Sequence, residues 1–332
     1  MKVKQLQIWL FSRLRILALF FASIVIVSAC GEADQRESEI AKIEVDYELE
    51  RFDRLFDEAQ PSDLGELKSD YPFLFSKQAP DSIWTLMMED SLQKVLRSEV
   101  KKQFANTVKL EDDIETLFQY IKYYDKSFSE PRVIGITNDV DYRNKVFVTD
   151  TIVLLALDNY LGGKHEFYAN IPVYKAKNME PEQLISDLAT AYSENYIFQS
   201  KRKSLLDEMI YFGKQLYFKD RVIPFVTDAV KIGYNQDEMM FAIENENYIW
   251  EHLVEKEYLF STDSKLPGRF VADAPFTKFY LELDRQSPGR LGQYIGWQIV
   301  RAYMEKTDTP FMEMLQKDAT EIFNTSKYKP PK

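Results

Sequence analysis

Histidine and cysteine, which often bind metals or act as nucleophiles, are scarce in this chain of 332 residues. His165 and Glu166 begin a stretch like the HExxH motif of zinc peptidases, but Ala169 stands where the second histidine is needed. That motif binds one zinc ion through two imidazoles one helical turn apart. The preceding Gly162-Gly163 pair and the following Pro172 favour a loop. We therefore expect no metal at His165.

The second histidine, His252, lies in a stretch, 236–258, whose apolar residues recur at helical spacing. On such a helix His252 shares the charged side with Glu255, one turn away. The pair could share an ion, but a solvated helix face is the simpler interpretation. We expect His252 to face solvent.

An aspartate-rich stretch resembles a calcium loop only in part. Asp139, Asp141 and Asp150 fall at the first, third and twelfth positions, but Asn144 replaces the glycine that an EF-hand requires at the sixth. The sequence therefore predicts no metal and no cofactor.

No familiar catalytic motif is present in the sequence, since it has no GxSxG, P-loop or GxGxxG pattern. Carboxylates are abundant, so a glycosidase-like pair of acids stays an alternative, although no linear spacing marks one. The clusters Asp207-Glu208 and Glu244-Asn245-Glu246 are the candidates, but solvated helix faces are the simpler explanation for them. We predict no catalytic residue.

The lone cysteine, Cys30, ends an export signal. A basic start is followed by an apolar run, 16–27, and then by the small residues Ser28 and Ala29. This run is too short to span a bilayer, which takes about 20 residues. The pattern predicts a lipoprotein signal peptide, 1–29, whose removal leaves an acylated Cys30 at the new N-terminus. Palmitate-like chains there would anchor the protein to a membrane of the cell envelope.

The composition limits the possible ligands of the exported part. Residues 1–29 contain four basic and no acidic residues, so the remainder carries a formal net charge of −15, against −11 for the whole chain. So acidic a protein repels nucleic acid and anionic lipid, and we expect neither as a partner. The 23 Phe, 20 Tyr and 4 Trp supply a large aromatic core.

The periodicities indicate an α+β fold, predominantly helical, in one globular domain. Residues 30–41 read as a polar tether and 42–332 as the domain. Alternating and β-branched runs predict a small sheet from 132–137, 146–148 and 151–157. Helical patterns occupy 47–59, a segment starting at 61–63, 81–88, 91–106, 111–124, 182–198, 204–218, 221–231, 236–258, 276–284, 289–305 and 310–317.

Glycines inside two predicted helices form a possible groove or packing site. Tyr211 and Gly213 lie in one helix, and Gly292, Gly296 and Trp297 lie in another. Glycines at i and i+4 strip side chains from one helix face, so another backbone can approach it closely. Either a ligand groove or tight helix packing would use this face, and we favour packing.

Several motifs together resemble the gliding-motility lipoprotein family GldB of the Bacteroidetes. They are the signal ending at Cys30 and the segments 209–214, 233–234, 274–276, 288–303 and 326–330. The resemblance implies an envelope lipoprotein required for gliding, with partners in the gliding or secretion machinery.

A fainter resemblance joins the second half to zincin-type peptidases. The helix 182–198, where that family carries its HExxH motif, contains no histidine, and Phe212 precedes Gly213 where a glutamate ligand is expected. The resemblance thus implies a zincin-like fold whose metal ligands have been lost.

Our leading hypothesis is a non-catalytic, lipid-anchored accessory or binding protein of the gliding apparatus. One alternative is an envelope hydrolase that acts on glycan or peptide through buried carboxylates. A structural scaffold within a larger complex is another.

Overall fold

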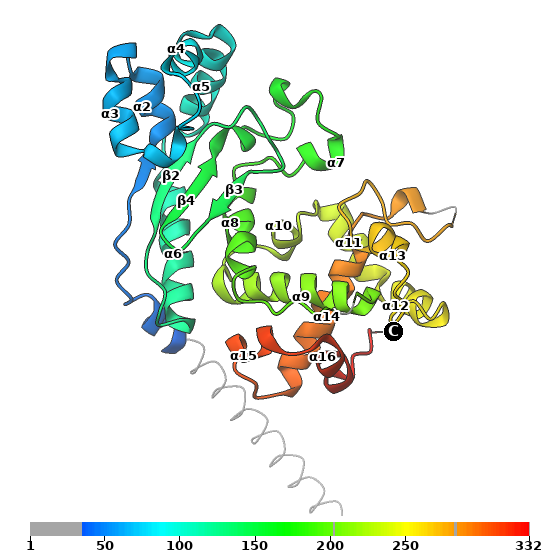
Figure 1. The fold of residues 1–332 in the computed structure, drawn as a ribbon. Coiled ribbons are helices and arrows are strands. Elements are labelled where there is room, and N and C mark those ends of the chain that lie inside the picture. The colour runs from blue at the N-terminus through cyan, green and yellow to red at the C-terminus, as the bar shows by residue number, and fades with distance from the viewer. Residues whose placement is uncertain (1–34, 202, 282–283, 332) are drawn as a thin grey trace, which may run out of the picture. The chain divides into compact units, whose positions relative to one another are not determined.

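The computed structural model describes residues 35–201, 203–281 and 284–331 (Figure 1). The predicted signal peptide and Cys30 therefore lie outside the described residues. The chain divides after Val45 into two compact units. In the first, residues 35–40 of the predicted tether are helical. The second unit holds the sheet and the elements that follow.

A four-stranded sheet, in the order β1-β2-β4-β3, is present among the described residues. Its parallel strands are β1 (Leu49–Arg51), β2 (Arg132–Ile136) and β4 (Ile152–Ala156), and β3 (Val146–Val148) is antiparallel at the edge. The apolar runs of β2 and β4 are typical of a sheet covered on both faces. Strands β2, β3 and β4 confirm the prediction.

Strand β1 corrects the prediction of a helix over 47–59. Leu49 to Arg51 pair with Val133 to Gly135 of β2, so α2 begins only at Phe52. The apolar residues of 47–59 have helical spacing, but pairing with a distant strand takes the first of them.

The helices near the sheet's first strands enclose one core. They are α2 (Phe52–Glu58), α3 (Leu64–Asp70), α4 (Asp81–Glu89) and α5 (Ser91–Gln103), with 3-10 turns at Pro61–Asp63 and Pro72–Leu74. Phe56, Tyr71, Phe75 and Met88 pack there against Ile134 of β2. Helix α6 (Val108–Tyr124) follows and buries its predicted apolar face.

The rest of the second unit is helical. Its elements are α7 (Val173–Ala176), α8 (Gln183–Ser193), α9 (Leu205–Val222), α10 (Asp228–Ile232), α11 (Gln236–Glu244), α12 (Glu246–Glu255), α13 (Lys265–Phe270), α14 (Leu291–Lys306), α15 (Phe311–Gln316) and α16 (Ala319–Ser326), with 3-10 turns at Leu157–Asn159, Glu166–Tyr168 and Asp284–Gln286. The predicted α+β, mostly helical class is confirmed. Within the described part of the chain, no helix has the length and apolar character to cross a membrane.

The predicted helix 221–231 is wrong in its first part, because α9 continues to Val222 and α10 begins only at Asp228. The predictions 236–258 and 276–284 also differ from the observed helices, for local reasons. The stretch 236–258 divides at Asn245, whose side-chain amide donates to the carbonyl of Phe241 (2.9 Å) and ends α11. Residues 276–281 form no helix, because the carboxylate of Asp284 accepts backbone N–H bonds from Phe279, Tyr280 and Leu281. Such bonds from an aspartate favour a turn over a helix.

Helices α9 and α14 cross with their backbones in contact (Figure 1). A Cβ atom added at Gly296 would lie 1.9 Å from the carbonyl oxygen of Met209, and one at Gly213 would lie 2.4 Å from the carbonyl group of Gly296. Gly292 lies farther along α14, where a Cβ would lie 2.8 Å from the carbonyl oxygen of Phe270. No side chain larger than hydrogen fits at this crossing unless the helices separate.

The substitution Gly296→Ala should therefore destabilise the fold. Overpacking typically lowers the free energy of unfolding by about 1–3 kcal/mol, and contact with backbone places this site at the upper end or beyond. The matched control is Gly268→Ala in α13, where an added Cβ meets nothing within 4 Å. That control should leave stability unchanged or raise it by up to about 1 kcal/mol. Denaturant unfolding checks both, and equal stability of the two variants would contradict the packing argument.

Candidate functional site

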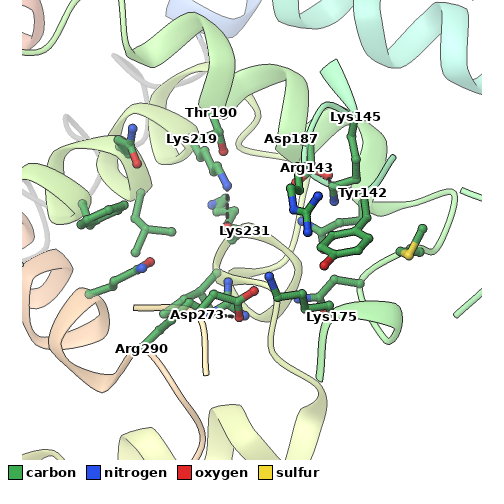
Figure 2. Close-up of a pocket in the computed structure, with 18 residues that line it drawn as sticks. Tyr142, Arg143, Lys145, Lys175, Asp187, Thr190, Lys219, Lys231, Asp273 and Arg290 are labelled. Carbon is green, nitrogen blue, oxygen red and sulfur yellow. Dashed lines mark hydrogen bonds and ion pairs between the residues drawn. The ribbon is translucent and has the colours of Figure 1, made fainter. Parts of the chain in front are cut away.

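A cavity of about 310 Å³ lies among the segment before β3, helices α8, α9 and α10, and the start of α14 (Figure 2). The described residues that line it include six basic and two acidic side chains: Arg143, Lys145, Lys175, Lys219, Lys231 and Arg290, with Asp187 and Asp273. A concentration of positive charge in so acidic a chain makes this cavity the candidate site.

Lys219, which comes from α9, is one of the two buried cations of the cavity, with Lys231. The residue is only 6% exposed. Its ammonium group donates to the hydroxyl of Ser186 on α8 (2.9 Å) and to the carbonyl of Lys231 on α10 (2.7 Å). Burial lowers the pKa of Lys219 to about 7, opposed by Asp187 and reinforced by Arg290, Lys145 and Lys231.

Lys231 is held by a network centred on Asp220 of α9. Its ammonium group lies 2.9 Å from one carboxylate oxygen of Asp220 and 3.4 Å from Asp228. The other Asp220 oxygen accepts from the indole of Trp297 and from Arg301, each at 2.8 Å. The network joins α9, α10 and α14, so it fixes one wall of the cavity.

On α8, Asp187 accepts hydrogen bonds from Lys145 and from the hydroxyl of Tyr160 (3.0 Å). The ammonium of Lys145 also lies over the Tyr160 ring, 5.4 Å from its centroid. Burial, with the nearby carboxylate, raises the pKa of Tyr160 well above its ordinary value. Asp187 is thus held by two fixed donors.

Tyr142 carries two cations at the rim of the cavity. The guanidinium of Arg143 lies 5.3 Å, and the ammonium of Lys175 lies 4.9 Å, from the centroid of its ring (Figure 2). These are cation–π distances.

The loop that leads to Tyr142 is anchored by Asp158, a fully buried carboxylate. It accepts from the backbone N–H of Asn138 (3.1 Å) and of Val140 (2.8 Å). Burial raises the pKa of Asp158 to about 6. Asp158 thereby positions the backbone that precedes Tyr142 and Arg143.

Arg290 is the residue before α14, and it lines the cavity. Its backbone is left-handed, with φ of 62°, a conformation that costs a non-glycine residue on the order of 1–2 kcal/mol. Its guanidinium donates to the carbonyl of Gly233 (2.8 Å), which is itself left-handed at the end of α10, and lies 3.8 Å from Asp273. These contacts hold Arg290 at the cavity wall.

The residues predicted as a groove or packing site do not line this cavity. Gly213 and Gly296 form the α9–α14 contact, Gly292 faces α13, and Trp297 is fully buried. Tyr211 lines a separate, smaller pocket with Asp207 and Glu208. The α9–α14 crossing therefore supports the cavity wall without opening into it.

The cavity cations were missed in the sequence analysis. One signal was present: Lys214 and Lys219 lie in a strongly apolar stretch of α9, where ammonium groups must find buried partners. Lys214 donates to the carbonyls of Leu315 (2.9 Å) and Lys317, and it does not line the cavity.

Neither histidine contributes to the cavity. The Nδ1 atom of His165 accepts from the backbone N–H of Phe167 (3.3 Å), and its Nε2 atom lies 3.4 Å from Glu99. The prediction that His252 faces solvent is wrong, because its ring packs edge-on against Phe279 with centroids 5.1 Å apart, and burial lowers its pKa. In the described ranges, no group of three or more His, Cys, Asp or Glu could hold a metal ion.

The two carboxylate clusters considered for hydrolysis have structural partners. Glu246 is buried and accepts from the hydroxyls of Tyr294 and Tyr328, each at 2.7 Å. Asp207 forms the capping box of α9 with Ser204. Neither acid lines the cavity.

Comparison with known proteins identifies the class as gliding motility lipoproteins. The family model described as gliding motility protein GldB matches residues 33–330. The chain therefore belongs to the GldB family, as the sequence resemblance predicted, and this membership gives it a role in gliding motility. No curated protein and no solved structure matches the chain. The zincin resemblance stays a prediction.

The buried ammonium of Lys219 should make stability depend on pH. Its pKa falls from the ordinary 10.5 to about 7 on folding, so between these values the unfolded chain binds more protons. The contribution of Lys219 to the free energy of unfolding therefore rises with pH across this window, by at most about 1.4 kcal/mol per pH unit. Lys219→Met should remove this contribution, and Lys94→Met, at an exposed site of α5, should keep it. Urea unfolding at several pH values from 7 to 10 measures how steeply the free energy of unfolding changes with pH. The same pH dependence for Lys219→Met and the unsubstituted protein would contradict the prediction.

Proposed function

We propose that this protein is a lipid-anchored, non-catalytic binding component of the gliding apparatus. Its cavity is the binding site in this proposal. The observation that carries the proposal is the convergence of six basic side chains from five segments of the chain on one cavity (Figure 2). Family membership supplies the link to gliding.

The state of the cavity's side chains supports binding over catalysis. Asp187 already accepts from Lys145 and Tyr160, so it is poorly placed to take a proton from a substrate. The hydroxyl of Thr190 donates to the carbonyl of Ser186 (3.0 Å). Lys219 is held between a hydroxyl and a carbonyl. Fixed polar groups of this kind are suited to orienting a ligand.

The anchor predicted at Cys30 supports a role at a membrane surface. Each buried CH₂ of an acyl chain contributes about 0.8 kcal/mol to membrane attachment, so several chains hold the protein firmly. Confinement to the membrane raises the effective concentration of the cavity towards partners there.

The anchor is tested by Cys30→Ala in a gliding host whose own gene is deleted. The variant should move from the membrane to the soluble fraction, lose palmitate labelling and fail to restore gliding, because no thiol remains to be acylated. Ser38→Ala, on the mature side of the signal, is the control and should retain all three properties. Membrane retention and continued labelling of Cys30→Ala would contradict the anchor.

The cavity is tested in the same host by reversing charge at its rim. Arg143→Glu combined with Lys175→Glu should leave the protein folded and anchored but reduce gliding, because both side chains line the cavity. Lys94→Glu combined with Lys101→Glu, on exposed positions of α5, is the charge-matched control and should glide normally. Normal spreading of the rim variant would overturn the proposal that binding occurs in this cavity.

A further inference from the structure

We infer that the cavity binds an oxyanion, a phosphate or carboxylate group of a small ligand, with Lys219, Lys175 and Arg143 as its charge partners. This inference rests on the proposed function, which places binding in the cavity, and adds the chemistry of the ligand. It follows from which cations of the cavity already have a carboxylate partner and which do not.

Lys219 is a buried cation without a counter-charge at contact distance. Both of its hydrogen-bond partners, the Ser186 hydroxyl and the Lys231 carbonyl, are neutral oxygens. Among the residues that the structure describes, no carboxylate lies within ion-pair distance of it. In its protonated form the Lys219 amine has three donors, so one remains for a ligand, and a bound anion would favour that form. Burial of an unpaired charge is unfavourable, and an anion in the cavity would offset that cost.

Lys175 and Arg143 are also without an ion pair to any described carboxylate. Both instead lie over the ring of Tyr142. The ring does not neutralise their charge, so each cation keeps hydrogen-bond donors for an oxyanion in the cavity. The rim and the interior of the cavity therefore offer donors to the same kind of group.

The remaining three cations are paired already. Lys231 contacts Asp220 and Asp228, Lys145 contacts Asp187, and Arg290 lies near Asp273 and donates to a carbonyl. Their role is to build the wall. Their positive charges also lower the pKa of Lys219.

The size and the apolar part of the lining restrict the ligand. The volume of about 310 Å³ is at the lower end of the range for small-molecule pockets, about 300–1,000 Å³. Met179, Phe212, Leu216 and Ile232 line the cavity beside the cations. A small ligand with one or two acidic groups therefore fits better than an extended polyanion, which the net charge of the chain would repel.

The experiment uses the lipidated full chain in neutral detergent, titrated calorimetrically with inorganic phosphate and, separately, with succinate. Sodium chloride keeps the ionic strength constant, so that only specific binding produces a signal. Binding of phosphate alone or of succinate alone supports the inference and names the source of the oxyanion. Binding of both supports a site for either group. Absence of binding by both overturns it.

Variants then locate the site. Arg143→Gln combined with Lys175→Gln, and separately Lys219→Met, should each weaken binding about tenfold or more, as expected for lost hydrogen bonds to a charged group. Lys94→Gln is the control for lost surface charge, and Lys214→Met is the control for a buried lysine of the same helix outside the cavity lining. Both controls should bind like the unsubstituted protein.

Because Lys219→Met could unfold the protein, circular dichroism checks the fold of this variant, and the rim variant tests the site independently. Unweakened binding in the rim variant, or equal weakening in Lys94→Gln, would overturn the inference.

The outcomes separate this inference from the proposed function. If neither anion binds but charge reversal at the rim stops gliding, the cavity functions with another ligand and the inference fails alone. If an anion binds through Lys219 but the rim variants glide normally, the proposed function fails and the anion site stands.

Discussion

The contact between the backbones of α9 and α14 is the constraint on which the rest of the second unit depends. Gly213 and Gly296 allow the two helices to touch, and at this distance Trp297 and Arg301 reach Asp220 on the facing helix. Asp220 in turn pairs with the ammonium of Lys231. The backbone carbonyl of Lys231 accepts a hydrogen bond from the ammonium of Lys219. A local steric condition at two glycines thus determines where a buried charge lies several residues away. If the helices separated by the width of a methyl group, this chain of hydrogen bonds could not close, and the wall of the cavity would lose its order.

The cavity and the chain as a whole differ in the sign of their charge. The chain as a whole is acidic, but six basic groups line one cavity. Three of them are paired with neighbouring aspartates, while Lys219, Lys175 and Arg143 have no ion pair with a described carboxylate. A division of this kind is characteristic of binding sites, where a few polar groups are fixed by the scaffold and a few are left for the ligand. It also explains why carboxylates that seemed suited to hydrolysis are occupied: Glu246 stabilises two buried tyrosines, and Asp207 begins a helix.

Much of the fold could be predicted from the sequence, because strands β2, β3 and β4 and most helices have local periodicity. The glycines of α9 and α14 were also identified, since their spacing shows a bare helix face before any partner is known. Strand β1 could not be predicted, because its three residues join the sheet only through pairing with Val133 to Gly135. The cavity could not be predicted either. Its lining comes from segments as distant as Tyr142 and Gln293. A lysine such as Lys219, taken alone, is expected at a solvated surface, and only the tertiary positions of Ser186 and the Lys231 carbonyl make its burial possible.

The contrast between acidic exterior and basic cavity has a kinetic consequence. An approaching anion meets the repulsive field of the whole molecule first and the attraction of the cavity only at short range. Dissolved salt shortens the reach of that outer field to about 8 Å at physiological ionic strength, while charges inside a recess are shielded much less. Entry of an anionic ligand should therefore become faster as salt is added, which is the reverse of electrostatic steering. Such a long-range electrostatic barrier favours a ligand that a neighbouring protein on the same membrane delivers at short range over a ligand that diffuses in from bulk solution.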